Sequence, residues 1–467
     1  MNRLVPEKSI WLHLGAGAFH RAHQAWYLNL LKNAGHCEWG LSLANIRNSA
    51  TQLTLQQLAR QQGRYTLEII SPEGDKQYQT ITVVDQVILW DELLRTLIAQ
   101  GANPRTKIIS FTVTEGGYFL KEDGHLDVEH HAILADLSER GESSTLYGAL
   151  CKILRARMLS GGEPVTLLSC DNLRNNGSSF YRGLLDFVAA KNDLPLLNWI
   201  QQNTSAPNSM VDRITPKINT AIHARLTDDG IHDDQVPVSC EAFSQWVLED
   251  DFIAGRPPLE NVGVEFVSSV TPYEEAKIRV LNASHSGVAW AGALLGKQYI
   301  DESLLPQVKT WIRSYVSEDV KPALQPTEID VDYYSATILK RFSNTWIRDT
   351  NQRVSSDSIA KLHEFIIPTL KARYQMGHTP KATLILPALW FRFMHKRHQG
   401  QLAFEYQDRA LNSVDFNTIF TSNDPLSAFA RTKKIFGGIS DQPTFVDDLR
   451  HALARVDVAM ASMQGEP

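Results

Sequence analysis

Four polar side chains recur in a stretch that follows Pro272 and reads as the opening of a helix. They are Glu274, Lys277, Asn282 and His285. At about 100° per residue, these four and Leu281 fall within one arc of roughly 140°. Desolvation on such a face would lower the pKa of Lys277 and suit it to act as a general base, while Asn282 and His285 could hold a carbonyl or alkoxide oxygen. The face therefore predicts proton transfer at an oxygen, and a helix with one solvated face is the structural alternative.

A glycine turn lies near the start of the chain, between a short apolar strand at residues 10–14 and a helix predicted for residues 21–34. Gly15 allows a tight turn, and Gly17 lets backbone amides approach a pyrophosphate at the helix N-terminus. The third glycine of the common fingerprint is absent, and His20 stands in its place. A bare G-x-G is often only a turn, but its position between strand and helix indicates the opening of a dinucleotide-binding fold.

Polar loops follow two further predicted strands. Thr114, Glu115 and Gly116 follow the strand at residues 107–113, and Asn172 follows the strand at residues 165–170. Because ligands bind at the carboxyl ends of strands in open α/β sheets, both loops are expected beside cofactor or substrate. The structural alternatives are a plain glycine turn in the first loop and helix capping by Asn176 in the second.

The strand predicted for residues 39–46 is followed by Arg47 and Asn48. The common NAD fingerprint has an aspartate or glutamate here, which bonds the ribose hydroxyls. Asn48 could still bond a ribose, whereas an arginine suits a 2′-phosphate. The residues by themselves therefore leave both NAD and NADP open.

Longer strings are more specific than these separate signals. They are G-A-G-A-F-H-R-A-H at residues 15–23, V-D-R-I-T-P at residues 211–216, K-x-R-x-x-N-x-x-H at residues 277–285 and D-T-x-x-R at residues 349–353. The chain resembles the polyol-specific long-chain dehydrogenases, the mannitol dehydrogenase group, over nearly its whole length. The resemblance implies metal-free oxidation of a secondary alcohol of a polyol to a ketose with NAD as cofactor. D-arabinitol to D-xylulose is the expected reaction, and a monomer is the expected state.

The same resemblance implies roles for individual residues. Lys277 is the implied general base, Asn172 and Asn282 stabilise the alkoxide, and His285 orients the substrate oxygen. The implied cofactor-binding residues are Gly15, Gly17, Ala18, Phe19, His20, Arg47, Asn48, Thr114, Glu115 and Gly116, with Glu115 also beside the route from the lysine to solvent. The implied substrate contacts are Asp212, Glu274, Arg353 and Lys361. From the residues alone, Arg353 could equally cap a helix or pair with Asp349 or Asp357, and Asp212 could simply pair with Arg213.

The length of 467 residues suggests two or three domains. Residues 1–270 are expected to form an α/β domain, doubly wound and Rossmann-type, with additions that include a hairpin of residues 65–70 and 77–84. Residues 271–467 are expected to form a mainly α-helical substrate domain, with the site in the cleft between the two. Helices in this second part are predicted for residues 277–295, 304–318, 333–341, 356–374, 382–396 and 445–463.

Composition excludes several classes of protein. A net charge of -6 argues against nucleic-acid binding, and no apolar run approaches membrane length. The four cysteines are widely spaced without a C-x-x-C, which fits a reducing cytoplasm and disfavours structural zinc. His125, His130 and His131 are expected on a solvated face, because no suitably spaced carboxylate or cysteine completes a metal site.

Other functions are weighed against this reading. Tyr273 and Lys277 also satisfy Y-x-x-x-K, the pair of short-chain dehydrogenases, but such chains are far shorter and open with a different glycine loop. Zinc-dependent polyol dehydrogenases need a ligand set that the sequence does not show. Mannitol 2-dehydrogenase and hexuronate reductase activities of the same family stay open, the latter with an extra cation near the substrate carboxylate. A nucleotide-binding sensor would keep the glycine loop without needing Lys277, Asn282 and His285 together.

Overall fold

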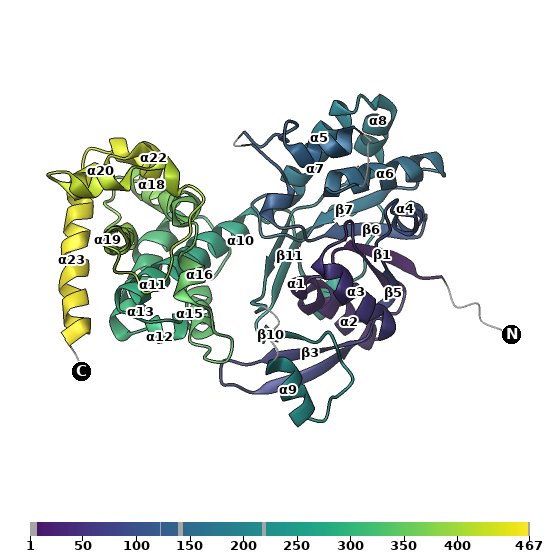
Figure 1. The fold of residues 1–467 in the computed structure, drawn as a ribbon, viewed down its shortest axis with the longest axis horizontal. Coiled ribbons are helices and arrows are strands. Elements are labelled where there is room, and N and C mark those ends of the chain that lie inside the picture. Colours follow the sequence, from purple (N-terminus) through teal and green to yellow (C-terminus); the bar gives the residue numbers. More distant parts are fainter. Residues whose placement is uncertain (1–6, 122, 139–142, 217–220, 466–467) are drawn as a thin grey trace. The chain divides into compact units, whose positions relative to one another are not determined.

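The computed structural model describes residues 7–121, 123–138, 143–216 and 221–465. The chain divides into two compact units (Figure 1). The first comprises residues 1–71 and 75–271, and the second comprises residues 72–74 and 272–467.

A six-stranded parallel sheet forms the centre of the first unit (Figure 1). Its strands are β1 (Ser9–Leu14), β2 (Trp39–Ala44), β5 (Val84–Ile88), β6 (Thr106–Phe111), β7 (Val165–Ser169) and β8 (Thr204–Ser205). They lie in the order β5-β2-β1-β6-β7-β8. Numbered by their occurrence in this sheet, that order is 3-2-1-4-5-6, the order of doubly wound dinucleotide-binding folds. The predicted Rossmann-type architecture is confirmed.

Both faces of this sheet are covered, because neighbouring side chains on a strand point to opposite faces. Trp11 packs into one hydrophobic cluster with residues of α2 (Gln24–Asn33) and α3 (Ala50–Arg60). Its neighbour Leu12 packs into a second cluster with residues of α4, α6 and α7. Those helices span Arg95–Ala102, Leu146–Leu159 and Asn176–Ala190, and α5 (His131–Leu137) and α8 (Leu194–Asn203) complete this group. The predicted helix at residues 21–34 is broken at His23, which separates α2 from α1 (Ala18–Ala22).

Two small sheets are added to the central one. The hairpin of β3 (Tyr65–Ile70) and β4 (Lys76–Ile81) is antiparallel, as predicted, and β10 (Val238–Glu241) extends it. The hairpin ends at Ile81, so Val84 belongs to β5 and not to the hairpin as the sequence suggested. The second small sheet contains β9 (Ser209–Asp212), β11 (Gln245–Glu249) and β12 (Glu265–Val267), and α9 spans Ala221–Asp228.

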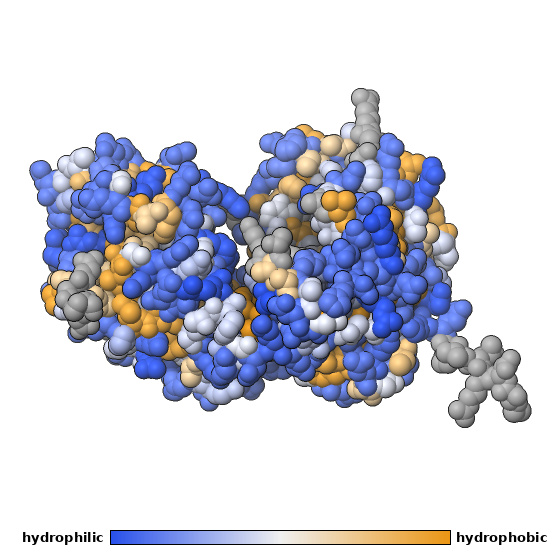
Figure 2. All heavy atoms as spheres, turned by 60° about the horizontal axis from the view of Figure 1, so that its bottom comes forward, coloured by the Kyte–Doolittle hydropathy of each residue, from blue (hydrophilic) through white to orange (hydrophobic). Residues whose placement is uncertain are grey.

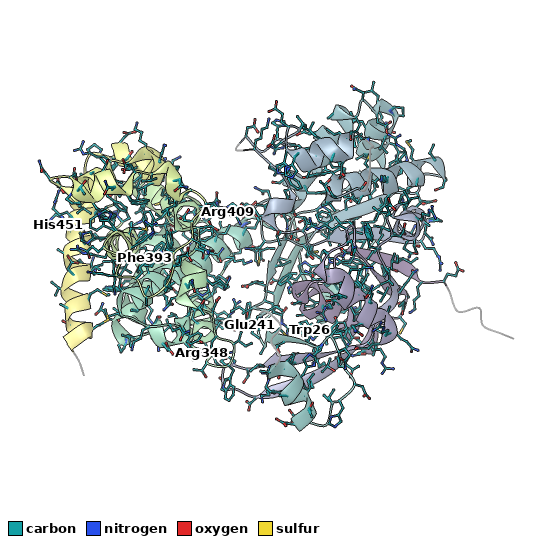
Figure 3. The ribbon with its side chains drawn as sticks, viewed as in Figure 1. Trp26, Glu241, Arg348, Phe393, Arg409 and His451 are labelled. Atoms are coloured by element: carbon teal, nitrogen blue, oxygen red, sulfur yellow. The ribbon has the colours of Figure 1, made fainter. Side chains whose placement is uncertain are left out.

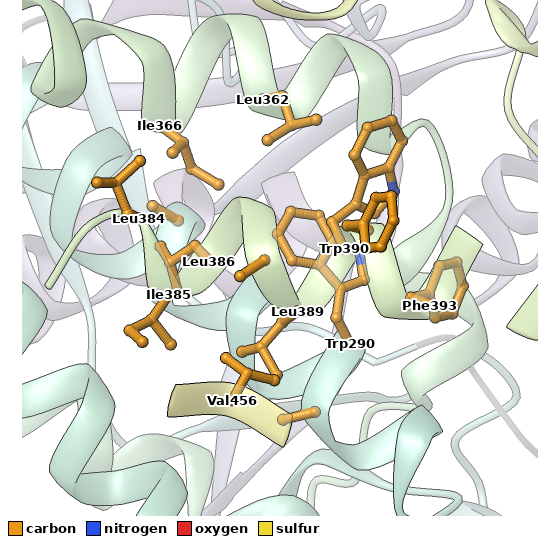
Figure 4. Close-up of a cluster of buried hydrophobic side chains, with 14 of the residues drawn as sticks. Trp290, Leu362, Ile366, Leu384, Ile385, Leu386, Leu389, Trp390, Phe393 and Val456 are labelled. Carbon is orange, nitrogen blue, oxygen red and sulfur yellow. The ribbon is translucent and has the colours of Figure 1, made fainter. Parts of the chain in front are cut away.

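From Thr271 onward the described chain is mainly helical, as predicted. Its α-helices are α10 (Thr271–Ala276), α11 (Ala283–Leu294), α12 (Ile300–Ser303), α13 (Pro306–Ser314), α14 (Lys321–Ala323), α15 (Val331–Phe342), α16 (Asn351–Ser355), α17 (Ser358–Lys361), α18 (Ile367–Gln375), α19 (Ile385–His398), α20 (Phe416–Thr421), α21 (Pro425–Ala430), α22 (Lys433–Phe436) and α23 (Phe445–Gly465). Three π-helical segments were not predicted: η3 (Lys277–Asn282), η4 (Tyr315–Val320) and η5 (Leu362–Ile366). Trp290 of α11 and Trp390 of α19 lie in the core, with ring centroids 6.4 Å apart (Figure 4).

The surface is mixed, and hydrophilic residues cover most of the face drawn in Figure 2, with smaller hydrophobic patches between them. All four cysteines are free thiols, with Cys37 exposed and Cys151, Cys170 and Cys240 buried. In the described ranges, no helix combines the length and the apolar character that crossing a membrane requires.

Candidate active site

The glycine turn of the first unit leaves open space beside the end of β1. Gly15 has φ +115°, and a Cβ at this position would lie 3.3 Å from Oγ1 of Thr112, so both backbone and packing favour glycine. A Cβ on Gly17 would meet no atom within 4 Å. Gly17 precedes α1, whose first amides donate no hydrogen bond to a capping side chain. α1 begins with Ala18 and Phe19. Open space beside the amides at the start of this helix fits the pyrophosphate of a dinucleotide.

His20 is completely buried and stacks on His13, with ring centroids 3.4 Å apart and planes inclined by 11°. Burial, together with the charge of Arg21, lowers the pKa of His20 to about 3. Burial also holds the pKa of His13 well below its usual value, and its Nδ1 lies 2.7 Å from Oγ of Ser110. Both rings are therefore neutral, and the structure places the His20 imidazole in the core of the unit rather than at its surface.

Arg47 and Asn48 are exposed just past the end of β2, directly after the buried residues Asn45 and Ile46. In dinucleotide folds the adenine ribose lies at this strand end. Both side chains therefore lie at the strand end where a ribose or a 2′-phosphate is expected.

The loop after β6 is held by a carboxylate from the neighbouring strand end. Asp171 accepts hydrogen bonds from the amides of Val113 (3.0 Å) and Thr114 (2.8 Å) and from the hydroxyl of Tyr118 (3.0 Å). Burial raises the pKa of Asp171, and these hydrogen bonds oppose that rise. These hydrogen bonds hold the loop while Thr114, Glu115 and Gly116 stay exposed, and a Cβ on Gly116 would meet no atom within 4 Å. Open space again fits a ligand beside this loop.

Asn172 is exposed and directly follows the buried Asp171, so the hydrogen bonds of Asp171 also hold the backbone of Asn172 in place. A role was predicted for Asn172 and none for Asp171. The sequence could have indicated this contact. Asp171 follows β7, the amides of Val113 and Thr114 follow β6, and the parallel pairing of these two strands brings their ends together. The predicted capping residue Asn176 is buried, and its amide nitrogen donates to the carbonyls of Asp171 and Ser209, both at 2.9 Å.

Asp212 ends β9 and is buried. Its neighbour Arg213 donates to the carbonyls of Ala22 (2.6 Å) and Glu241 (3.0 Å) and lies 4.3 Å from the ring centroid of Trp26. Figure 3 labels Trp26 and Glu241, which flank this arginine. Arg213 thus joins segments of the first unit, and this network positions the backbone that presents Asp212.

In the second unit, the helix that carries the predicted catalytic face contains a π turn. The amide of Ala283 bonds to the carbonyl of Ile278, five residues earlier. In an uninterrupted α-helix Lys277 and Asn282 would lie about 140° apart around the axis. A π turn closes hydrogen bonds between residues i and i+5, so it brings residues five apart to nearly the same side. Lys277 and Asn282, the two ends of the π segment, therefore project from one side of the helix.

Lys277 and the neighbouring Glu274 are buried, with 7% and 5% of their surfaces exposed. His285 lies one turn further, on α11, and stacks on Phe342 with ring centroids 4.5 Å apart. Burial, followed by the charges of Arg353, Lys361 and Arg341, lowers the pKa of His285 to about 3. His285 is therefore a neutral ring, able to donate through one nitrogen and to accept through the other.

The predicted substrate contacts Arg353 and Lys361 both act on His285 electrostatically. Arg353 pairs with Asp349, one of the two carboxylates considered for it, through its Nε at 2.5 Å and also through its Nη2. Lys361 donates to the carbonyl of Val354 at 2.7 Å. Burial, reinforced by Arg353, lowers the pKa of Lys361 to about 8. The second unit thus gathers a lysine, an amide, a neutral imidazole and two cations.

Within the described ranges, no group of three or more histidine, cysteine, aspartate and glutamate side chains could hold a metal ion. The chemistry offered by the described residues is that of proton transfer and hydrogen bonding to oxygen.

Comparison with known proteins identifies the family. Residues 9–261 match the model of the mannitol dehydrogenase Rossmann domain, and residues 269–457 match that of the mannitol dehydrogenase C-terminal domain. The chain is 47% identical to a D-arabinitol 4-dehydrogenase of Klebsiella pneumoniae, over 96% of this chain and 98% of that protein. It is 44% identical to a D-arabinitol 4-dehydrogenase of Ralstonia nicotianae, over 97% of both chains.

A solved structure agrees with these relatives. It is the Pseudomonas fluorescens mannitol 2-dehydrogenase in a ternary complex with NAD and D-mannitol, which matches with a TM-score of 0.82 and 32% identity. The match covers 99% of this chain and 94% of that chain. The chain therefore belongs to the mannitol dehydrogenase family, and it is a polyol dehydrogenase with an N-terminal Rossmann dinucleotide-binding domain.

Proposed function

We propose that this polyol dehydrogenase oxidises D-arabinitol to D-xylulose with NAD and without a metal ion. The observation that supports this best is the 47% identity to a D-arabinitol 4-dehydrogenase over nearly the full length of both chains. That identity exceeds the 32% shared with the mannitol 2-dehydrogenase of known structure. A monomer in the cytoplasm is proposed with it, and the four free thiols fit a reducing compartment.

In the proposed mechanism, Lys277 accepts the proton of the secondary hydroxyl at its neutral Nζ. When bound, NAD supplies the acceptor for the hydride that leaves the same carbon. The amide groups of Asn172 and Asn282 donate hydrogen bonds to the alkoxide oxygen as charge develops on it. His285, which is neutral, fixes the orientation of that oxygen. The product is the ketone, and Lys277 carries the proton away from it.

The remaining predicted residues bind the reactants. Asp212, Glu274, Arg353 and Lys361 are proposed to contact the other hydroxyls of the polyol. The cofactor is proposed to lie along the first unit's glycine turn and strand-end loops, at Gly15, Gly17, Ala18, Phe19, His20, Arg47, Asn48, Thr114, Glu115 and Gly116. For His20, which is buried, the proposed contribution is the backbone of the turn.

The test is a panel of polyols and ketoses with NAD and NADP, measured on the wild type and on Lys277→Ala. D-arabinitol with NAD should give the highest kcat/KM, and Lys277→Ala should lose most of its kcat while NADH binding survives. Tyr273→Phe is the matched control. An inactive Tyr273→Phe beside an active Lys277→Ala would replace this mechanism with that of the short-chain dehydrogenases.

A further inference from the structure

An arginine–aspartate pair belongs to the group of charges around His285. The Nε and Nη2 of Arg353 donate to the two carboxylate oxygens of Asp349. A guanidinium has five N–H donors, so this bidentate contact occupies two of them and leaves three. The two donors that it occupies form one complete edge of the guanidinium, the geometry that a carboxylate prefers.

The backbone that carries Asp349 is held in place. The carbonyl of Asp349 accepts a hydrogen bond from the amide of Ile300 at 3.0 Å, and the amide of Asn351 donates to the carbonyl of Gln298 at 2.9 Å. Thr350 between them caps α16 by accepting from the amide of Arg353. The backbone segment that carries the Asp349 carboxylate is therefore held in a fixed position.

The two side chains of the pair differ in exposure. The side chain of Asp349 is 20% exposed, whereas that of Arg353 is 65% exposed. The carboxylate is therefore the less exposed partner of the pair. An incoming ligand meets Arg353 with one edge already occupied.

Three positively charged side chains act on His285, and the carboxylates of Asp357 and Asp408 act on one of them, Lys361. Arg353, Lys361 and Arg341 all act on His285, and Arg353 also acts on Lys361. Asp349 supplies a negative charge in direct contact with this group. Without it, Arg353 would carry an uncompensated charge and would offer a second bidentate edge to a sugar carboxylate.

We propose that Asp349 determines the charge class of the substrate, which rests on the function proposed above. By pairing with Arg353, Asp349 compensates the charge of this arginine, while the three remaining N–H donors stay available to hydroxyl groups. A sugar acid whose carboxylate approaches the same arginine meets a positive charge that is already compensated and the like charge of Asp349 beside it, so neutral polyols are selected over sugar acids.

The experiment compares wild-type enzyme with Asp349→Asn, which keeps the shape and removes the charge. The readouts are kcat/KM for D-arabinitol and the inhibition constant of D-arabinonate, a five-carbon sugar acid, against D-arabinitol. In Asp349→Asn the inhibition constant of D-arabinonate should fall by roughly tenfold, and the gain should shrink as salt is added. Asp349→Ser is measured alongside and should show the same gain, so a folding failure of one variant leaves the test in place.

Two controls separate this role from a general loss of an ion pair. Asp349→Glu keeps the charge and should bind D-arabinonate as weakly as the wild type. Asp301→Asn breaks a similar bidentate pair, in which Nε and Nη2 of Arg348 donate at 3.0 and 2.9 Å (Arg348 is labelled in Figure 3). Arg348 is not among the charges that act on His285, so this variant should leave D-arabinonate inhibition unchanged.

The outcomes separate the two proposals. A wild type that oxidises D-arabinitol, together with neutral variants of Asp349 whose D-arabinonate inhibition is unchanged, would overturn the role of Asp349 and leave the proposed function standing. A wild type that turns over sugar acids and no neutral polyol would overturn the proposed function itself.

Discussion

The hydroxyl of Tyr315 donates a hydrogen bond of 2.7 Å to the backbone carbonyl of Arg279, inside the π-helical segment that carries Lys277 and Asn282. The preceding carbonyl, that of Ile278, bonds five residues ahead. Where the backbone hydrogen bonds of a helix change from i+5 back to i+4 spacing, one carbonyl receives no hydrogen bond from a helix amide. Arg279 is the next residue, and Tyr315 supplies a donor to its carbonyl.

Tyr315→Phe should therefore weaken the π turn. Leaving this part-buried carbonyl without its donor costs on the order of 1 kcal/mol of unfolding free energy. Because a change of register rotates Lys277 away from Asn282, kcat should fall on the order of tenfold or more with a smaller change in KM. Kinetics and urea unfolding of the same variant measure both effects.

A second tyrosine gives the control for that prediction. Tyr374 of α18 in the same unit donates to Asp448 of α23 at 2.9 Å, and neither residue belongs to η3. Tyr374→Phe should lose stability without losing kcat. Equal losses of kcat in the two variants would show that Tyr315 contributes stability alone.

Substrate binding should weaken as the pH rises through about 8, the pKa to which burial and Arg353 lower that of Lys361. In the proposed site, Lys361 is protonated below this pH and donates to a polyol oxygen, and above it the positive charge is lost. The KM for D-arabinitol should therefore rise above about pH 8 in the wild type and stay flat in Lys361→Met. Lys371→Met, at an exposed position of α18, should behave like the wild type.

The same lysine affects stability with a defined sign. Its pKa in the folded chain lies below that in the unfolded chain, so folding penalises the protonated form. That penalty is complete below about pH 8 and is released as the pH rises toward about 10.4. Lys361→Met should remove this part of the pH dependence of urea unfolding, and a wild type without it would contradict the lowered pKa.

Asn172→Ala and Asn282→Ala should each reduce kcat by about 10²–10³, because each removes one of the two donors proposed for the alkoxide. The effect should appear mainly in kcat. Asn176→Ala is the contrast, since this buried amide bonds backbone carbonyls and its loss should appear in unfolding. A change confined to KM in either of the first two variants would make that asparagine a binding contact instead.

Cofactor preference should be moderate in the wild type, with NAD favoured over NADP. Asn48→Asp should sharpen it, because a carboxylate at this exposed strand end repels a 2′-phosphate. The ratio of kcat/KM for the two cofactors measures this, with Asn33→Asp as a control of equal charge change at an exposed site on α2. A wild-type ratio in favour of NADP would reverse the assignment of the cofactor.

Activity should survive exhaustive chelation. In the proposed mechanism the amides of Asn172 and Asn282, and no metal ion, stabilise the negative charge of the alkoxide. The measurement is kcat before and after treatment with a chelator, together with metal analysis of the active protein. Stoichiometric zinc that is lost together with activity would refute a metal-free mechanism.

The architecture of the first unit follows from patterns that the sequence displays locally. Short buried strands, a glycine turn and polar loops after strands were enough to predict a doubly wound sheet with its strand-end loops. β5 was missed because its residues continue the run that forms β4, and only pairing with β2 separates the two. Contacts between distant segments carry no such local pattern.

The catalytic face of the second unit illustrates the same limit. Its residue types and spacing predicted a lysine, an amide and an imidazole on one side of a helix. The π turn that aligns Lys277 with Asn282 was not predicted, because the sequence periodicity of an α-helix gives no sign of it. One stabilising contact of that turn comes from Tyr315, a residue 36 positions away from Arg279.

The distribution of thiols makes this chain its own reporter of partial unfolding. All four cysteines lie in the first unit, and three of them are buried. A thiol reagent should modify Cys37 at once and reach Cys151, Cys170 and Cys240 only when that unit opens. Labelling rates, compared with loss of helical signal, would therefore show whether the dinucleotide-binding unit opens before the helical unit or together with it.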